Sequence, residues 1–253
     1  MKILIIGATG ETGQRLLKLA LQADHEVTLY IRDNSKLQKQ SGGEACPECR
    51  VIVGDVFDRA ALVEACRDQD VVINAAGNVS DGEQFETLVK TVSQAVEEGL
   101  GTGGRFWFFG GAGALDVPGT NKMTVNLPKI PPLFRAHERN YKTVRATSLN
   151  WSMLCPGPMT AAVDGQPHRD LRISTDIWPV PRPAVTRMMP PIATALAFKL
   201  KIPEMTIAYE DAARVILENL IQDGPLVKKR VGVALPHGMK RSKDIRALTG
   251  QRN

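Results

Sequence analysis

The sequence has 253 residues, of which 43% are hydrophobic and 23% are charged, and its formal net charge is +5. Because these proportions are typical of a soluble globular protein and the length allows a sizeable core, we expect one domain spanning residues 1–253. An anionic cofactor accounts for so small a positive excess, which by itself does not indicate a nucleic-acid partner.

Apolar runs in the sequence are short. The first, at residues 2–6, ends at a glycine and is too short for the core of a signal peptide. No run approaches the roughly 18 apolar residues of a membrane span. We therefore expect a cytoplasmic protein that has no membrane partner.

Strand-like and helix-like segments alternate as far as Cys155. Continuous apolar runs predict strands at residues 2–7, 26–31, 51–53, 71–74, 105–109 and 151–155. Apolar residues at helical spacing predict helices at residues 13–23, 59–66, 84–98 and 131–146. This alternation predicts an α/β fold with a doubly wound parallel sheet, whose crossover helices cover both faces.

Regular patterns are lost after Pro156. Residues 157–203 are rich in proline and show no helical or strand period, and residues 176–183 are expected to form an extended loop, because a residue before proline avoids the helical region. Regular structure is expected to resume with a helix at residues 210–220, a strand at 230–234 and a short helix from Ser242.

The strongest signal is the glycine-rich run at residues 7–13, between the first strand and the first helix. Glycines let the backbone turn sharply and approach a pyrophosphate, and the helix amino terminus supplies unpaired N–H groups and a positive dipole. A second strand follows at the expected distance, so the run predicts a dinucleotide-binding turn. Its expected cofactor contacts are Gly7, Thr9, Gly10, Glu11, Thr12 and Gly13.

The end of the second strand decides between the two nicotinamide dinucleotides. Sites that select NAD usually have a carboxylate there, which holds the ribose hydroxyls. Here Arg32 can bind a 2′-phosphate through charge-assisted hydrogen bonds, and Lys36 can assist, so we expect NADP(H). Asp33 leaves two alternatives open, because it can pair with Arg32 or point to solvent.

Two later strands end in segments that fit the same site. Asp55 and Val56 follow the third strand, where a carboxylate can accept a hydrogen bond from the adenine amino group. The fourth strand ends in Asn74, Ala75, Ala76 and Gly77, whose small side chains let a cofactor pass closely. Ligands of such folds bind at the carboxyl edge of the sheet.

These motifs resemble those of atypical short-chain dehydrogenases/reductases of the NAD(P)H-binding, NmrA-like group, a layout similar to that of flavin reductases and biliverdin-IXβ reductases. The segments at residues 147–158 and 207–213 share the resemblance, whereas residues 112–130 and 159–203 do not. The resemblance implies that Pro156 and Gly157 pass near the nicotinamide and that residues 159–203 form an irregular segment covering the substrate.

The familiar proton relay of that superfamily, Tyr-x-x-x-Lys with a Ser or Thr after the fifth strand, is absent. Tyr141 and Lys142 are adjacent, so their side chains diverge by about 100° on a helix. Glycines at 110, 111 and 113 occupy the place of the hydroxyl residue.

A substitute proton donor is conceivable on the same helix. His137 and Tyr141 lie four residues apart and share one face, which is either a catalytic face or a packing face. Glu138 and Lys142 are expected to form a solvated ion pair. We keep His137 and Tyr141 as the catalytic candidates.

Cysteine and histidine positions suggest no further chemistry. Cys46 and Cys49 have the spacing of half a zinc site, but no second pair lies nearby, so we expect an ordinary loop and no bound metal. We expect His25, His168 and His237 to be surface residues. The basic clusters near residues 228 and 240 are expected to be solvated rather than to bind nucleic acid.

The sequence thus predicts an NADPH-dependent oxidoreductase that reduces a small planar or carbonyl-bearing acceptor of flavin, quinone or aldehyde type. Phe134, Trp178, Met188 and Met189 either form an apolar lid over this small-molecule substrate or are packing residues. The alternative function is a non-catalytic NADP(H) sensor with a regulatory protein partner. A homo-oligomer stays open, and a nucleotide-sugar epimerase is disfavoured because such enzymes normally keep the Tyr/Lys pair.

Overall fold

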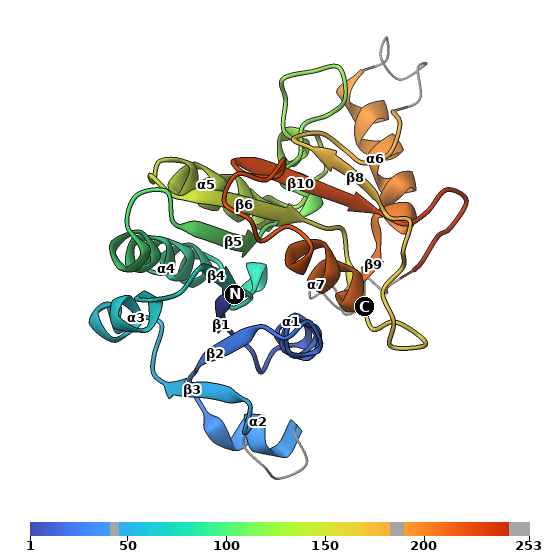
Figure 1. Ribbon diagram of the computed structural model, residues 1–253. Coiled ribbons are helices and arrows are strands. Elements are labelled where there is room, and N and C mark those ends of the chain that lie inside the picture. Colours follow the sequence, from blue (N-terminus) through green and yellow to red (C-terminus); the bar gives the residue numbers. More distant parts are fainter. Residues whose placement is uncertain (41–45, 183–189, 243–253) are drawn as a thin grey trace.

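The structure is a computed structural model that describes residues 1–40, 46–182 and 190–242 (Figure 1). Its eight-stranded sheet has the order β3-β2-β1-β4-β5-β6-β10-β8. The strands are β1 (Lys2–Ile6), β2 (Glu26–Ile31), β3 (Cys49–Val53), β4 (Val71–Asn74), β5 (Arg105–Phe109), β6 (Asn150–Cys155), β8 (Arg172–Thr175) and β10 (Lys229–Ala234). All neighbours pair in parallel except β8, which runs antiparallel to β10. The doubly wound α/β fold is confirmed.

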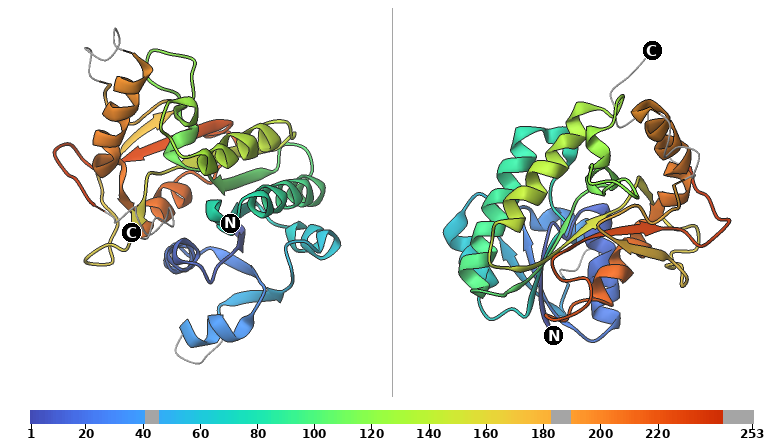
Figure 2. Two further views of the ribbon diagram at one scale, coloured as in Figure 1. Left: turned by 180° about the vertical axis from the view of Figure 1, so that it is seen from behind. Right: turned by 90° about the horizontal axis from the view of Figure 1, so that it is seen from above.

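Helices cover both faces of the sheet (Figure 2). The helices are α1 (Glu11–Gln22), α2 (Asn34–Gln40), α3 (Arg59–Cys66), α4 (Glu83–Leu100), α5 (Arg135–Arg145), α6 (Pro191–Met205) and α7 (Tyr209–Leu217). On one face α4 packs between α3 and α5, and on the other α1 packs against α7. Short 3-10 turns occupy Val79–Asp81, Ala112–Ala114, Thr124–Asn126 and Pro132–Phe134, and β7 (Met159–Thr160) pairs with β9 (Ile207–Ala208).

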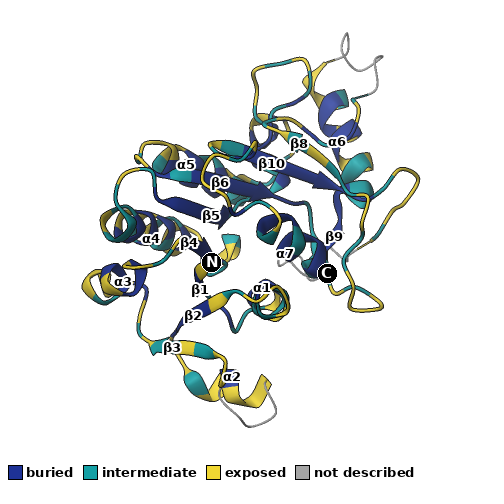
Figure 3. Cartoon of the chain, in the orientation of Figure 1, coloured by how far each residue is buried: buried dark blue, intermediate teal, exposed yellow. Residues whose placement is uncertain are grey.

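The central strands are buried on both faces because alternate side chains enter two separate cores. Leu4 and Ile6 of β1 contribute to the core under α3, α4 and α5, whereas Ile3 and Ile5 contribute to the core under α1 and α7. Figure 3 shows this burial along β1, β4, β5 and β6, in contrast with the more exposed β3 and α2. The buried strands fix the carboxyl edge of the sheet, from which the site residues project.

The stretch at residues 159–203 contains more regular structure than its sequence pattern predicts. It contributes β7, the edge strand β8 and the 15-residue helix α6. The pattern concealed α6 because Pro190, Pro191 and Pro203 flank or enter it and because Ile192, Leu196 and Leu200 remain exposed. The expected helix after Ser242, and Met188 and Met189, lie outside the described residues.

The loop before β3 also differs from the prediction. Cys46 and Cys49 form a disulfide, so the expectation of an ordinary loop is wrong. A turn closed by the hydrogen bond from the Cys49 N–H to the Cys46 carbonyl places the two Cα atoms 5.3 Å apart, a separation that suits a disulfide. Within the described ranges no group of three or more His, Cys, Asp or Glu side chains is arranged to hold a metal ion.

No helix of the described chain is long and apolar enough to span a membrane.

Candidate cofactor site

The turn after β1 brings backbone segments into close contact. Gly7 has a φ of +82°, and a Cβ atom on it would lie 2.7 Å from the backbone nitrogen of Ala76. Gly13 lies against the Gly7 carbonyl oxygen and the Cα of Ala8, with no room for a side chain. Gly7 and Gly13 are therefore required by the packing of β1, α1 and the loop after β4.

The amino terminus of α1 offers backbone N–H groups at this turn. Gly10 caps the helix without a side-chain hydrogen bond, and its own N–H donates to the Gly7 carbonyl at 3.0 Å. The first N–H groups of a helix have no partner within the helix and carry its positive dipole, so they suit a pyrophosphate. The Glu11 side chain forms an ion pair of 2.8 Å with Arg15 and is largely exposed.

The loop after Thr9 is held by side chains that sequence reasoning did not identify. The Thr9 carbonyl accepts hydrogen bonds from the side-chain amides of Gln14 and Gln40, at 3.4 and 3.1 Å. Gln40 lies at the end of α2, 31 residues from Thr9. Nothing in the local sequence signals this contact, because only the fold brings α2 beside the glycine turn.

The basic residues at the end of β2 are exposed. Asp33 accepts a hydrogen bond of 2.8 Å from the Ser35 N–H at the start of α2, and hydrogen bonds from Ser35 lower the pKa of that carboxyl. The open alternative is thereby resolved, since Asp33 caps α2 and does not pair with Arg32. No hydrogen bond or ion pair joins the Arg32 or Lys36 side chain to another residue of the described ranges, so both can bind a ligand anion.

The turn after β3 leaves one oxygen of Asp55 available. Its Oδ1 accepts from the Phe57 N–H at 3.0 Å, and its backbone carbonyl accepts from the Tyr30 hydroxyl at 2.9 Å. The Tyr30 ring fills the space beside Gly54, where a Cβ atom would collide with the hydroxyl. Val56 is buried beneath this turn.

Asn74 shapes the loop that follows β4. It is buried, and its Oδ1 accepts from the Ala76 N–H at 3.0 Å. Gly77 has a φ of +104°, and a Cβ atom there would lie 2.7 Å from the Phe85 ring. These contacts hold Ala75, Ala76 and Gly77 against the edge of the sheet, as close passage of a cofactor requires. Through the order β3-β2-β1-β4, the fold brings Asp55, Arg32, the glycine turn and Asn74 to one edge.

The segment after β6 is fixed by neighbours on two sides. The Pro156 carbonyl accepts a hydrogen bond of 2.7 Å from the Ala112 N–H. The Gly157 N–H donates to the Met205 carbonyl at 3.2 Å, and a Cβ atom on Gly157 would lie 2.7 Å from that oxygen. Gly157 is therefore needed for the contact with the end of α6. Its proximity to a nicotinamide stays a prediction.

His137 lies at the carboxyl edge, under the glycines that follow β5. Its Nε2 lies 2.7 Å from the point where a Cβ of Gly111 would stand, and its ring contacts Phe85 and Phe134 at centroid distances of 5.8 and 6.3 Å. Nδ1 is buried without a hydrogen-bond partner in the described structure. Burial lowers the pKa of His137 to about 4, so the ring is neutral at physiological pH.

Tyr141 shares the helix face of His137 but meets other neighbours. Its ring contacts Trp151 at a centroid distance of 5.6 Å, and the Arg230 guanidinium lies 4.8 Å from its centre. Trp151 opens β6, so Tyr141 faces away from the carboxyl edge. The structure does not bring the two catalytic candidates to one point, because α5 runs antiparallel to the strands and one helical turn separates them.

The remaining candidates behave mostly as packing or surface residues. Glu138 and Lys142 form the expected ion pair, at 2.8 Å, in which Lys142 is exposed and Glu138 is partly buried. The His168 ring lies 3.1 Å from the buried Asp211 carboxylate and is only partly exposed, whereas His237 is exposed as expected. Trp178 is buried, donates a hydrogen bond of 2.6 Å to the Thr124 hydroxyl and packs against Phe198, which favours the packing interpretation.

Comparison with known proteins shows which family the chain belongs to. The sequence profile of the NAD(P)H-binding family matches residues 7–189. The chain belongs to the NAD(P)H-binding family. Membership confirms the expected NAD(P)(H) cofactor and the resemblance to NAD(P)H-binding proteins, whereas the residues expected to contact the cofactor stay predictions.

Relatives of this NAD(P)H-binding protein include one of similar size. The uncharacterized protein YwnB of Bacillus subtilis is 31% identical over 164 residues, which cover 62% of this chain and 71% of YwnB. Phenylcoumaran benzylic ether reductase PT1 of Pinus taeda is 31% identical over 111 residues, or 42% of this chain and 34% of the plant enzyme. A short-chain dehydrogenase/reductase of Veillonella parvula, solved in complex with NADP, has the same fold with a TM-score of 0.66 and 15% identity over 96% of this chain and 98% of its own.

Proposed function

We propose that this NAD(P)H-binding protein is an NADPH-dependent reductase that transfers hydride to a small planar or carbonyl-bearing acceptor of flavin, quinone or aldehyde type. The glycine turn carries the proposal: Gly7 and Gly13 leave no room for side chains, and the amino terminus of α1 is free to bind a pyrophosphate. Arg32 is exposed and forms no ion pair within the described residues, which supports NADPH over NADH, because a guanidinium binds a phosphate through two parallel hydrogen bonds.

The residues around the turn account for binding and orientation. Arg32 and Lys36 hold the 2′-phosphate, the N–H groups at the start of α1 hold the pyrophosphate, and Asp55 accepts from the adenine amino group. Asn74 keeps the loop at residues 75–77 against the edge of the sheet, so that the cofactor passes across it. When bound, the nicotinamide supplies the hydride, and the protein supplies orientation and exclusion of water.

The proposed acceptor class rests on how the two candidate proton donors, His137 and Tyr141, are placed. His137 is neutral there, and Tyr141 faces the opposite end of β6, so neither of these two candidates offers a charged acid beside the expected nicotinamide position. Reduction of a flavin or quinone does not need a strong protein acid, because water completes the protonation. The name of the plant relative, a benzylic ether reductase, supports a reductive reaction on an aromatic compound.

The test is the loss of NADPH absorbance with a panel of flavins, quinones and aldehydes, run beside a titration of NADPH binding. Turnover with any acceptor, abolished in Gly13→Ala and retained in the surface variant Arg67→Gln, is expected. Arg67 directly follows α3 and forms an exposed ion pair with Glu64, so the control should leave the site intact. Failure to bind NADPH would overturn the proposal altogether.

A non-catalytic NADP(H) sensor is the second candidate, favoured by the missing Tyr-x-x-x-Lys relay and by the neutral His137. Such a protein binds NADP⁺ and NADPH and signals through a partner surface without turnover. Tight NADPH binding with no turnover across the panel would therefore support the sensor and contradict the reductase.

A further inference from the structure

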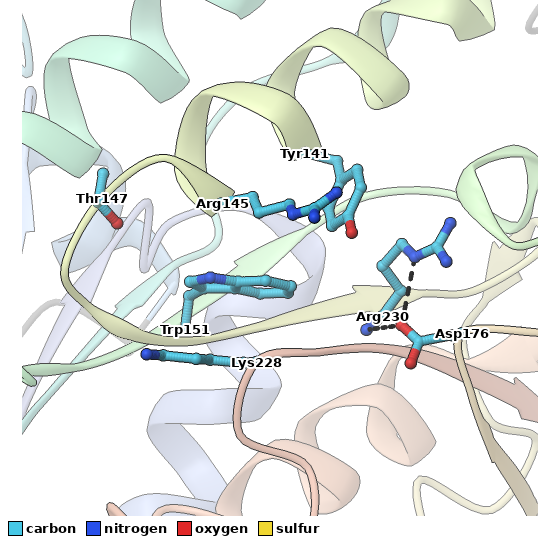
Figure 4. Close-up of a pocket in the computed structure, with 7 residues that line it drawn as sticks. All are labelled: Tyr141, Arg145, Thr147, Trp151, Asp176, Lys228 and Arg230. Carbon is cyan, nitrogen blue, oxygen red and sulfur yellow. Dashed lines mark hydrogen bonds and ion pairs between the residues drawn. The ribbon is translucent and has the colours of Figure 1, made fainter.

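A cavity lies at the opposite end of β6 from the candidate cofactor site. It has a volume of about 490 Å³ and is lined by Tyr141, Arg145, Thr147, Trp151, Asp176, Lys228 and Arg230. Figure 4 shows Tyr141 and Arg145 projecting from α5 on one side, with Trp151 of β6 opposite and Arg230 beside Asp176. Trp151 begins the strand that Pro156 follows, so roughly 16 Å of extended chain separates this cavity from the carboxyl edge.

The charge of one cationic residue in the cavity is already compensated. Arg230 is buried and forms two hydrogen bonds with the Asp116 carboxylate, at 3.0 and 2.7 Å, and one of 3.3 Å with Asp176. Although burial opposes its charge, these acidic partners raise the pKa of Arg230 above the usual arginine value. Arg230 therefore fixes the wall of the cavity and holds Asp176 in place.

Two other cations remain without an acidic partner. Arg145 and Lys228 are exposed at the rim, and neither forms an ion pair within the described residues. The Arg145 guanidinium stands 5.9 Å from the centre of the Tyr141 ring, and the Tyr141 hydroxyl has no hydrogen-bond partner among those residues. Two cations and a free hydroxyl donor around one cavity form a binding set for an anion.

The backbone at the cavity is held in an unfavourable conformation. Lys228 has a φ of +57° and Asp176 a φ of +67°, the left-handed region that favours glycine. The Lys228 N–H donates to the Trp151 carbonyl at 2.6 Å, which fixes the residue beside the aromatic wall. A lysine at a position that suits glycine indicates that its side chain has a use there.

We propose that this cavity binds a small organic anion, whose phosphate or carboxylate group is attracted by Arg145 and Lys228 at the rim and whose flat apolar body lies beside Tyr141 and Trp151. An inorganic anion would fill only a small part of the volume, which lies in the usual range for organic ligands. The site is separate from the cofactor site and does not depend on which reaction the protein performs.

Calorimetric titration with phenyl phosphate tests the proposal. The experiment is run with saturating NADP⁺, so that the probe cannot occupy the phosphate positions of the cofactor site. Saturable binding of one probe per chain is expected, tighter than that of inorganic phosphate. Arg145→Gln and Lys228→Gln should each weaken it about tenfold or more, since each removes a charged hydrogen bond.

The matched control is Lys142→Gln, which removes a cation from the same helix at an exposed position outside the cavity. It should bind the probe as the unmodified protein does, and NADP⁺ titration of every variant verifies the fold. Absence of binding at millimolar phenyl phosphate, equal binding of inorganic phosphate, or equal losses in the control and the two cavity variants would overturn the proposal. If NADP⁺ itself fails to bind, the probe titration is run without it and unfolding by urea verifies the fold instead.

Discussion

Gly13 on α1 and Gly7 after β1 are in direct contact, because the Cα of Gly13 lies against the carbonyl oxygen of Gly7. This contact lets α1 start immediately after the strand and directs its first N–H groups toward the ligand edge. A Cβ atom at residue 13 would overlap that oxygen and the Cα of Ala8, both of them backbone atoms that cannot move independently. The glycine is therefore a requirement of packing as well as of cofactor approach.

Gly13→Ala should lower the free energy of unfolding by about 1–3 kcal/mol, the usual effect of overpacking, and should abolish tight NADPH binding. Gly10→Ala is the comparison, because a Cβ atom there would lie 3.3 Å from the Gly7 oxygen and the backbone φ is −81°. Gly10→Ala should change the free energy of unfolding by less than about 1 kcal/mol while still lowering the affinity for NADPH. Urea unfolding and NADPH titration measure both effects, and equal destabilisation by the two variants would contradict this account.

Arg32 should determine the preference between the two nicotinamide cofactors. Arg32→Gln removes a charge-assisted pair of hydrogen bonds to a 2′-phosphate, so the Kd for NADPH should rise about 10- to 100-fold while the Kd for NADH changes little. This loss of NADPH affinity in Arg32→Gln should be smaller at high salt, because salt screens the interaction between exposed charges. Arg67→Gln, directly after α3, serves as the control. A parallel loss of NADPH and NADH affinity in Arg32→Gln would show that Arg32 does not contact the 2′-phosphate.

The sequence predicted those features of the molecule that the residues of one short segment determine. The glycine turn follows a buried strand and opens a helix, so the residues of one short segment determine both its shape and its use. Arg32 could be placed for the same reason, since strand β2 ends one residue before it. The apolar runs of β1, β4, β5 and β6 predicted their own burial because both faces of a doubly wound sheet are covered.

The features that the sequence did not predict depend on partners far along the chain. Strand β8 exists because it pairs with β10, and Arg230 is held by Asp116, 114 residues away. The separation of His137 from Tyr141 could not be predicted either. Helical spacing showed that they share a face, but only the direction of α5 across the sheet gives them different neighbours.

His137 should make stability depend on pH. Burial lowers its pKa to about 4 from the usual histidine value of about 6.5, so the unfolded chain binds the proton more readily. Its contribution to stability is therefore complete above about pH 6.5 and is lost as the pH falls toward 4. At pH 5 the loss relative to pH 7 should be about 2 kcal/mol.

His137→Gln isolates this effect from the titration of other groups. Unfolding by urea is measured at pH 7 and pH 5 for the protein and the variant, and the unmodified protein should lose about 2 kcal/mol more than the variant. The Glu138 and Lys142 pair on the same helix is present in both proteins, so its contribution cancels in the comparison. Identical pH dependence of the two proteins would show that His137 is not held neutral in the folded state.

Arg230 should be among the most costly charged residues to replace. Its side chain is 6% exposed, its guanidinium is bonded to Asp116, Asp176 and the Ala114 carbonyl, and it covers the Tyr141 ring. Arg230→Met keeps much of the volume but leaves the Asp116 carboxylate without its cationic partner and Asp176 with only Lys229, so the free energy of unfolding should fall by about 2–4 kcal/mol. Because these carboxylates are partly solvated, this decrease in the free energy of unfolding should be smaller than the largest decreases found when fully buried ion pairs are broken. Arg67→Met, which breaks an exposed pair, should cost less than about 1 kcal/mol, and similar losses for both variants in urea unfolding would contradict this structural role.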